Sequence, residues 1–195
     1  MTNPLDPADN DSTPLDNEER EGLLLSYITT RAELNEAELA CILKAEEWAF
    51  SRKREVLDQK FLDTLHKKML GEVWSWAGEI RKTEKNIGID AYQIRTEIKK
   101  LIDDCSFWID NETYDYDEIA TRFHHRLVYI HPYANGNGRH SRLAADLLLV
   151  SMGQERFSWG RKNLVSVSET RSSYIAALRS ADGHDYKYLL EFVRT

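Results

Sequence analysis

The chain has 195 residues and a formal net charge of -7 at pH 7. This length favours one domain with one sizeable core, and the charge disfavours a protein that binds nucleic acid through a basic surface. No apolar run approaches the ~20 residues that a membrane-spanning helix needs, and the N-terminus lacks the basic start and apolar core of a signal peptide. We therefore expect a cytoplasmic protein that neither spans a membrane nor binds nucleic acid directly.

The first 55 residues divide into a tail and a helical segment. Residues 1–16 are rich in Asp, Asn and Pro, which is typical of a flexible tail. Residues 17–55 are predicted to be helical, and their best-marked helix begins with Asn35 as N-cap and Glu38 closing a capping box. Cys41 in this helix and Cys105 further along both fall in partly apolar helical sequence, which favours buried free thiols over a disulfide.

Residues 56–195 are predicted to form the main domain. Apolar residues at helical spacing predict helices over about 61–70, 92–108, 119–130, from Gly138 or Arg139 to about 150, 169–181 and 185–193. The segment VWSWAGEIRKTEKNIGID, residues 73–90, lacks a helical period, and its IRKT and NIGI stretches predict two short strands of a hairpin. The fold class is therefore mainly α with one small hairpin.

The polar loop HPYANGNGRHSR, residues 131–142, interrupts the most apolar part of this domain. Pro132 cannot continue a helix and disfavours the α conformation at His131, so the preceding helix should end with His131 exposed at the mouth of the loop. Gly136 and Gly138 allow backbone N–H groups to converge at the positive start of the next helix. Such an arrangement predicts an anion site that suits phosphates.

The side chains of this loop predict phosphoryl or nucleotidyl transfer. Arg139 and Arg142 lie three residues apart on one helix face, where both can bind phosphate oxygens. His131 is placed to take a proton from an attacking hydroxyl, and Asn135 is the protein ligand expected for a divalent cation. The alternative is a plain helix-turn-helix corner in which the glycines only serve the turn. The sequence G-x-x-x-x-G-K-[ST] is absent, so an ordinary P-loop NTPase is excluded.

HPYANGNGRHSR resembles the signature of the Fic family, H-P-F-x-[DE]-G-N-G-R-x-x-R, with Tyr133 in the Phe position and Asn135 in the acidic position. The stretch VWSWAGEIRKTEKNIG is similar to the family's strand region before its flap, and RSSYIAALRSADGHDYKYLLEFV to its C-terminal helices. The resemblance covers about residues 56–195. With ITTRAELNEAE included, the chain looks most like the subgroup called mobile mystery protein B.

The resemblance implies a Fic fold, a helical bundle around a central helix-loop-helix with a β-hairpin flap. It also implies a protein adenylyltransferase that transfers AMP from ATP to a Ser, Thr or Tyr hydroxyl of a target protein. By motif position, His131 is then the general base, with Asn137 and Arg139 as catalytic partners, and Asn135 takes the Mg²⁺ position. The nucleotide and its phosphates would contact Gly136, Asn137, Gly138, Arg139, Arg142 and Tyr174. For Tyr174, core packing is the alternative.

Two further elements follow from the resemblance. The flap would bind the target by strand addition through Lys82, Thr83, Glu84, Lys85, Asn86, Ile87, Gly88 and Ile89; an ordinary surface loop is the alternative. NEEREG, residues 17–22, is similar to the family's inhibitory motif [S/T]-x-x-x-E-[G/N], so that Glu21 would pair with Arg142 and exclude the γ-phosphate. The alternative is an unremarkable acidic helix start.

Two other functions stay open at this point. One is transfer of a different nucleotide or phosphate moiety. The other, suggested by the neutral Asn135, is a catalytically weak, nucleotide-binding, toxin-like module of the toxin–antitoxin kind. The resemblance also implies a separate helix-turn-helix protein encoded alongside as a partner.

Overall fold

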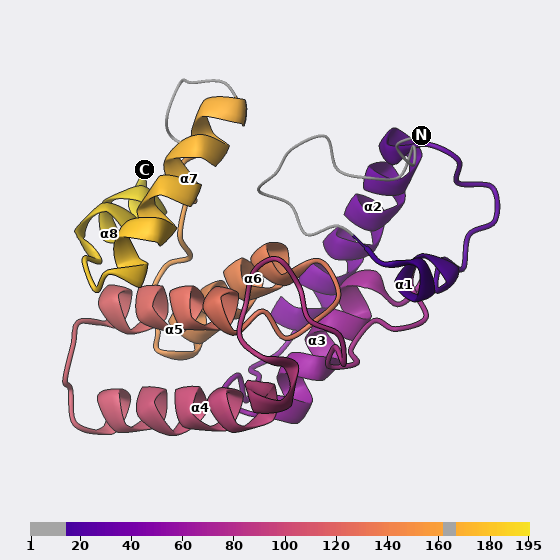
Figure 1. Ribbon diagram of the computed structural model, residues 1–195. Coiled ribbons are helices and arrows are strands. Elements are labelled where there is room, and N and C mark those ends of the chain that lie inside the picture. Colours follow the sequence, from indigo (N-terminus) through magenta and orange to yellow (C-terminus); the bar gives the residue numbers. More distant parts are fainter. Residues whose placement is uncertain (1–14, 162–166) are drawn as a thin grey trace.

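The computed structural model describes residues 15–161 and 167–195, and nearly all of the predicted tail lies outside these ranges. Between the described ends the chain is mainly helical, as predicted (Figure 1). Its elements are α1 (Asn17–Glu21), α2 (Arg31–Phe50), α3 (Gln59–Leu70), the 3-10 helix η1 (Ala91–Gln93), α4 (Ile94–Asp110), α5 (Tyr116–Ile130), α6 (Asn137–Ser151), α7 (Val167–Asp182) and α8 (Lys187–Arg194).

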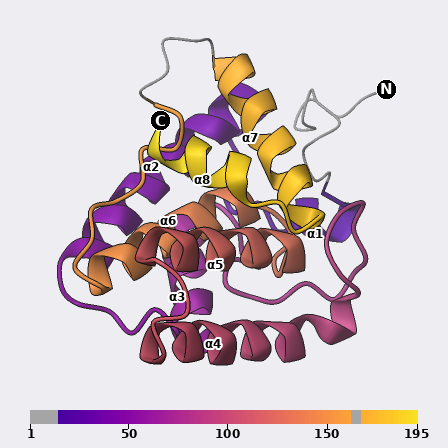
Figure 2. The same cartoon turned by 90° about the vertical axis from the view of Figure 1, so that its left-hand side faces the viewer.

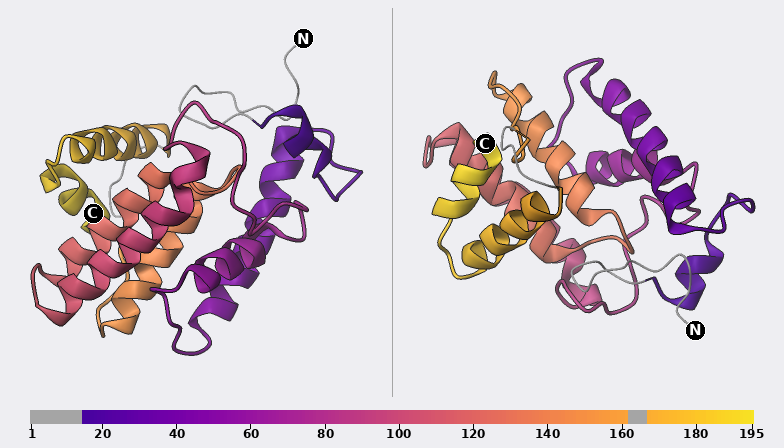
Figure 3. Two further views of the ribbon diagram at one scale, coloured as in Figure 1. Left: turned by 60° about the horizontal axis from the view of Figure 1, so that its bottom comes forward. Right: turned by 90° about the horizontal axis from the view of Figure 1, so that it is seen from above.

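Helix α5 is the centre of the arrangement, with α4 packed on one side and α6 on the other (Figure 2). The paired helices α2 and α3 lie on one flank of this layer, and the pair α7 and α8 on the other (Figure 3). The loop between α5 and α6 carries residues 131–136. It is therefore anchored at both ends by the best-packed helices of the molecule.

The packing of α5 follows its predicted apolar face. Ile119, Phe123, Leu127 and Ile130 are all buried there. Each fully buried side chain of this kind stabilises the fold by about 1.5–3 kcal/mol. Helix α6 is buried more widely, over Leu143–Leu149. Because both helices are fixed in this way, the loop that joins them is held at a defined position and orientation.

The start of α2 differs from the prediction. The helix begins at Arg31, and Thr30 is the N-cap: its side chain accepts from the Glu33 N–H, and Glu33 closes the capping box. Asn35 is an exposed residue inside the helix, and Glu38 is buried instead of capping. The prediction of Asn35 and Glu38 as caps was therefore wrong, because TTRAE offers the same cap-and-glutamate pattern one turn earlier.

The predicted β-hairpin does not form. In the described residues, the segment 79–90 has no strand, and an isolated bridge joins Leu23 to Trp74 nearby. The Arg81 side chain occupies the space inside the loop and donates to the carbonyls of Thr83, at 2.8 Å, and Ile89. Because these carbonyls accept from a guanidinium, they are not available for a ladder between the two predicted strands.

Both cysteines are free and buried, as predicted. No helix of the described residues is long and apolar enough to cross a membrane.

We predict that the free energy of unfolding falls as the pH is lowered below about 6.5, because the fold buries neutral histidines. Burial lowers the pKa of His124 to about 3 and of His131 and His140 to about 4, and it lowers the pKa of His66 as well. These groups contribute stability above pH ~6.5, the value in an unfolded chain, and that stability is lost as pH falls towards the folded values. Burial raises the pKa of Asp63 and Asp146. These two carboxyl groups favour the folded state at low pH, but they are fewer than the four histidines.

Urea unfolding followed by circular dichroism at pH 7.5 and pH 5.0 tests this. The free energy of unfolding should fall by at least about 2 kcal/mol at the lower pH. An equal or higher stability at pH 5.0 would mean that these imidazoles take up protons in the folded state.

Candidate functional site: the loop between α5 and α6

The site begins at His131, where α5 ends in a left-handed turn. His131 has φ 54° and ψ 61°, and its N–H still donates to the Leu127 carbonyl at 3.3 Å. Pro132 disfavours the right-handed α region at His131, so the helix ends there, but it does not by itself select the left-handed region. The carbonyl of His131 accepts from Arg81 Nε at 2.7 Å, which holds the turn in place.

His131 is buried and not exposed at the mouth of the loop as predicted; 6% of its surface is accessible. The flap is the reason: a Cβ added to Gly88, which has φ 98°, would lie 2.5 Å from His131 Cβ. The segment 82–89 therefore passes directly over the imidazole. Only glycine at position 88 allows this close approach.

The electrostatics around His131 favour the neutral imidazole. Burial lowers its pKa to about 4; the Val128 carbonyl acts against this shift, and the cations Arg81 and Lys85 add to it. At neutral pH the ring is therefore deprotonated and can accept a proton. This is the state that a general base needs before reaction.

Gly136 and Gly138 differ in whether the surrounding structure requires glycine at their positions. Gly136 is the N-cap of α6 with φ 77°, and a Cβ there would lie 2.6 Å from Leu70 Cδ1, so the fold itself requires glycine. Gly138 lies within the first turn of α6, and an added Cβ would meet only the Tyr174 hydroxyl, at 3.9 Å. Packing does not explain Gly138. The backbone of this first turn is therefore open, at the helix end that favours anions.

Asn137 braces the loop from inside. Its Oδ1 accepts from the Tyr133 N–H at 2.9 Å, its Nδ2 donates to the Tyr133 carbonyl at 2.7 Å, and 2% of the residue is exposed. The side-chain amide therefore braces the loop and does not point towards the proposed phosphate site, to which Asn137 could contribute its backbone N–H. Its part in the site is to close the turn through both backbone groups of Tyr133.

The Tyr133 ring anchors the loop to α3. It stacks on His66 with 3.8 Å between ring centroids, and its hydroxyl donates to Asp63 Oδ1 at 2.9 Å. His66 in turn contacts the Asn135 carbonyl through Nε2 at 3.0 Å. Tyrosine in the Phe position of the motif thus has the polar partner that its buried hydroxyl requires.

The two arginines of the motif flank the glycine loop. Arg139 pairs with the buried Glu38 of α2 at 2.7 Å, and its Nη2 lies 3.5 Å from Asn135 Oδ1. Arg142 donates to the Gly138 carbonyl at 3.2 Å, and its guanidinium lies 5.4 Å from the centroid of the Tyr174 ring. The structure therefore brings Tyr174 beside the second arginine and the open face of Gly138. The Tyr174 hydroxyl shares a hydrogen bond of 3.0 Å with His124.

Asn135 does not fit a resident metal site. Its Oδ1 accepts from the Gly136 N–H at 2.6 Å and faces the cationic Arg139. The described residues contain no group of three or more His, Cys, Asp or Glu side chains that could hold a metal. Mg²⁺ is usually held by one or two carboxylates together with substrate phosphates, and Asn135 offers one neutral oxygen. The protein side chains alone therefore do not make a Mg²⁺ site here.

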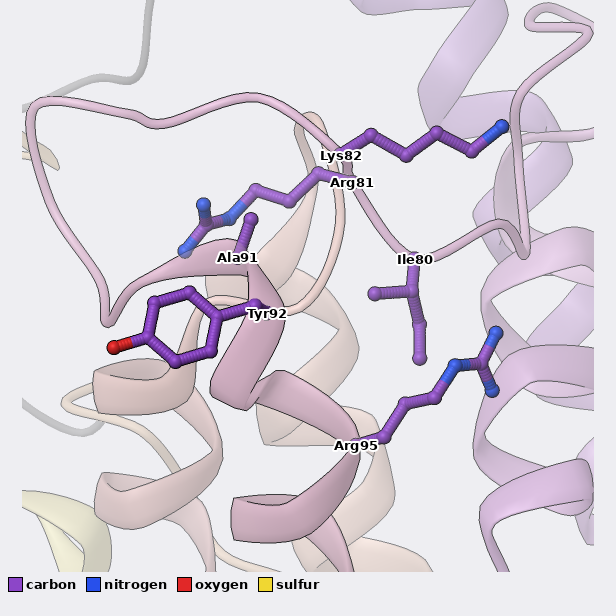
Figure 4. A pocket seen from close by; sticks show the side chains of 6 residues that line it. All are labelled: Ile80, Arg81, Lys82, Ala91, Tyr92 and Arg95. Carbon is purple, nitrogen blue, oxygen red and sulfur yellow. The ribbon is translucent and has the colours of Figure 1, made fainter.

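The flap residues lie beside this loop. Lys82, Thr83, Glu84, Asn86, Ile87 and Gly88 are exposed, and Lys85 and Ile89 are partly buried. Figure 4 shows Arg81 extending beneath the arch of the loop, while Lys82 points to the other side and Arg95 lies on the first turns of α4. These three side chains line a pocket of about 380 Å³ at the base of the flap. Sequence reasoning missed Arg81, because one arginine in IRKT gives no sign that it will be buried.

Helix α1 contacts the flap, but not through Glu21. Glu21 is exposed, and its side chain makes no hydrogen bond or ion pair with any described residue. The predicted pair with Arg142 is therefore not formed. The capping box between Asp16 and Glu19 sets the rotation of α1 so that Glu19 faces inward. Glu19 forms an ion pair with the buried Lys85 and accepts from Thr83 Oγ1 at 3.3 Å.

Taken together, the helices and the loop define a mainly α protein whose central helix-loop-helix places a helix start and two arginines beside a buried, neutral histidine. Comparison with known proteins agrees with this class. Residues 56–149, just under half of the chain, match the model of the Fic/DOC family.

The sequences of curated proteins and the solved structures that match this chain are also Fic proteins. The chain is 28% identical over 137 residues, 66% of this chain and 25% of the relative, to protein adenylyltransferase fic-1 of Caenorhabditis elegans. A similar match, 28% over 136 residues, is found with protein adenylyltransferase Fic of Drosophila grimshawi. The chain spans about a quarter of the length of these curated relatives.

Among solved structures, the BepC protein of Bartonella tribocorum with bound AMPPNP has a TM-score of 0.70 at 16% identity, over 92% of this chain and 97% of that one. The N-terminal Fic domain of a Bartonella quintana protein with bound ADP has a TM-score of 0.69 at 17% identity, over 90% and 94%. The predicted Fic fold is therefore confirmed, and the flap is an irregular loop in this chain instead of a hairpin.

Proposed function

We propose that the chain is a protein adenylyltransferase that transfers AMP from ATP to a Ser, Thr or Tyr hydroxyl of a target protein. One observation carries this proposal: a buried, neutral His131 lies at the entrance of a glycine loop that has a helix start and two arginines on its far side. The names of the relatives, protein adenylyltransferases, support the same activity.

In the proposed reaction, the target hydroxyl attacks the α-phosphorus of ATP. His131 takes the hydroxyl proton, a new P–O bond forms to the target, and the bond to the β-phosphate breaks so that pyrophosphate leaves. Arg139, Arg142 and the N–H groups at the start of α6 would bind the phosphates. Phosphoryl-type transition states are loose, so positioning and charge stabilisation contribute more than base strength, and an imidazole of low pKa suffices.

ATP would enter as its Mg²⁺ complex, and the metal then belongs to the substrate. The flap residues 82–89, most of which are exposed, would bind the target main chain by strand addition. We also propose a cytoplasmic location and, from the resemblance to mobile mystery protein B, a helix-turn-helix protein as partner. The two alternatives are transfer of another nucleotide or phosphate moiety, and a nucleotide-binding module with negligible catalysis.

Mass spectrometry after incubation of the full chain with Mg²⁺ and ATP in a host lysate tests the activity. A gain of AMP on a protein hydroxyl is the expected result. His131→Ala should reduce its rate by about 10²–10⁴-fold, because the proton acceptor is lost. Another adduct would support the first alternative. Absence of any adduct on any protein, with nucleotide still bound, would support the second and contradict the proposal.

Asn135→Asp should raise the transfer rate and lower the Mg²⁺ concentration needed for half of the maximal rate. The carboxylate adds the negative charge that a Mg²⁺ ligand usually provides. Measuring the rate against Mg²⁺ concentration for both proteins checks this. A lower rate for the aspartate variant at every Mg²⁺ concentration would contradict the assignment of position 135.

We further propose that α1 restrains the flap through Glu19 and not through Glu21. The Lys85 side chain is 5% exposed and forms ion pairs with Glu19 and with Asp16, at 3.8 Å to the latter. Lys85 is also close enough to His131 to lower its pKa. Closure of the flap over His131 is therefore coupled to the attachment of α1.

Glu19→Gln and Glu21→Gln form a matched pair within this one helix. Loss of the Glu19 charge should release Lys85 and raise the rate of auto-AMPylation several-fold, whereas the Glu21 variant should match the wild type. A raised rate for Glu21→Gln with no change for Glu19→Gln would restore the pairing of Glu21 with Arg142 as the restraint.

A further inference from the structure

Glu38 of α2 is a buried carboxylate in contact with the motif loop, although it lies outside the matched residues 56–149. Two per cent of the residue is exposed. Its Oε1 accepts from Trp74 Nε1 at 2.7 Å, and its Oε2 accepts from Arg139 Nη1 at 2.7 Å. Burying a carboxylate costs free energy unless it is fully paired. Even a buried ion pair adds little net stability, because the cost of desolvating both charges offsets their attraction. Glu38 therefore calls for a role other than stabilising the core.

Arg139 is held from two sides. Glu38 contacts Nη1, while Nη2 lies 3.5 Å from Asn135 Oδ1 and 3.9 Å from the place of a Cβ on Gly136. The guanidinium therefore lies beside the backbone of Gly136 at the start of α6. A guanidinium has five N–H donors in a planar fork, and Glu38 engages it at one nitrogen. With 32% of the side chain exposed, the other donors can meet an anion.

Glu38 is itself fixed, so it orients the arginine and does not merely follow it. The Trp74 ring that donates to it is 1% exposed and stacks on Trp76 with 5.0 Å between centroids. The Trp76 indole donates to the Glu19 carbonyl at 2.9 Å. A rigid aromatic pair thus holds one oxygen of the carboxylate, and the other oxygen points at Arg139.

We propose that Glu38 is a positioning residue that aims Arg139 at the phosphates of the bound nucleotide. The inference rests on the proposed function, in which Arg139 binds phosphate. It also gives α2 a part in the site, so that the predicted boundary between residues 55 and 56 does not divide the site from the N-terminal helical segment.

The test measures the affinity of the purified full chain for a non-hydrolysable ATP analogue and for adenosine by calorimetry. Glu38→Gln, which removes the charge at nearly constant size, should weaken binding of the ATP analogue about tenfold, because one charged hydrogen bond is lost. Adenosine has no phosphate, so its affinity should not change. Glu36→Gln, on an exposed position of the same helix, is the control and should bind both ligands like the wild type.

Two further variants separate positioning from structure. Trp74→Phe keeps the ion pair but removes the donor to Glu38, and it should weaken binding of the ATP analogue about threefold. In an Arg139→Gln background, Glu38→Gln should cause no additional loss, because Glu38 acts through Arg139.

Three results would overturn the inference. Equal losses for the ATP analogue and adenosine would mean a general structural defect. Tighter binding of the ATP analogue by Glu38→Gln would mean that Glu38 competes with phosphate for Arg139. An unchanged affinity would mean that Arg139 needs no such support. A wild-type chain that binds neither ligand would instead sink the proposed function, and this inference with it.

Discussion

The left-handed turn at His131 is the constraint on which the site depends. A non-glycine residue in this region costs of order 1 kcal/mol, and Pro132 disfavours the ordinary helical alternative. The turn persists because its backbone groups are engaged: Leu127 accepts from the N–H, and Arg81 donates to the carbonyl. Since Arg81 also organises the flap, one guanidinium determines where the base lies and what covers it.

The polar groups beneath the loop mainly fix its conformation. Their net contribution to the stability of the fold is small. Asn137 closes the turn, and Tyr133 with His66 fixes its outer part against α3. Each hydrogen bond contributes about 1 kcal/mol net, yet a buried group left unpaired would cost more than that. A fully satisfied network therefore excludes other loop conformations. Under the proposed function, this fixed shape is the preorganised state in which N–H groups and arginines stabilise a developing charge best.

Much of this could be predicted from the sequence, and the limits have physical causes. The helices carry strong apolar periods, so α3 to α8 were placed correctly to within a few residues. The phosphate loop was recognisable because its residue types and spacing are specific. The predicted hairpin was wrong. IRKT and NIGI have a local preference for strands, but the Arg81 guanidinium donates to the carbonyls of Thr83 and Ile89 in place of a strand ladder. Tertiary contacts at long sequence separation decided this, and no local pattern reports them.

The same reason explains the errors among the polar residues. Glu38 fits a capping box by sequence, but TTRAE caps the helix first and Glu38 reaches Arg139, about a hundred residues away. Asn137 was assigned to the phosphates by its place in the motif, and its side-chain amide binds the backbone of Tyr133, which leaves only its backbone N–H for that role. Glu21 matches an inhibitory pattern, yet the capping box of α1 points Glu19 to the flap. In each case the residue type was informative and its direction was set by the fold.

A crystal structure of the full chain with a non-hydrolysable ATP analogue tests the central claim most directly. The account predicts that the phosphates lie on the N–H groups of residues 136–138, within hydrogen-bond distance of Arg139 or Arg142, and with the α-phosphate on the His131 side of the loop. A nucleotide bound elsewhere, such as in the basic pocket at the base of the flap, with the loop empty, would contradict it.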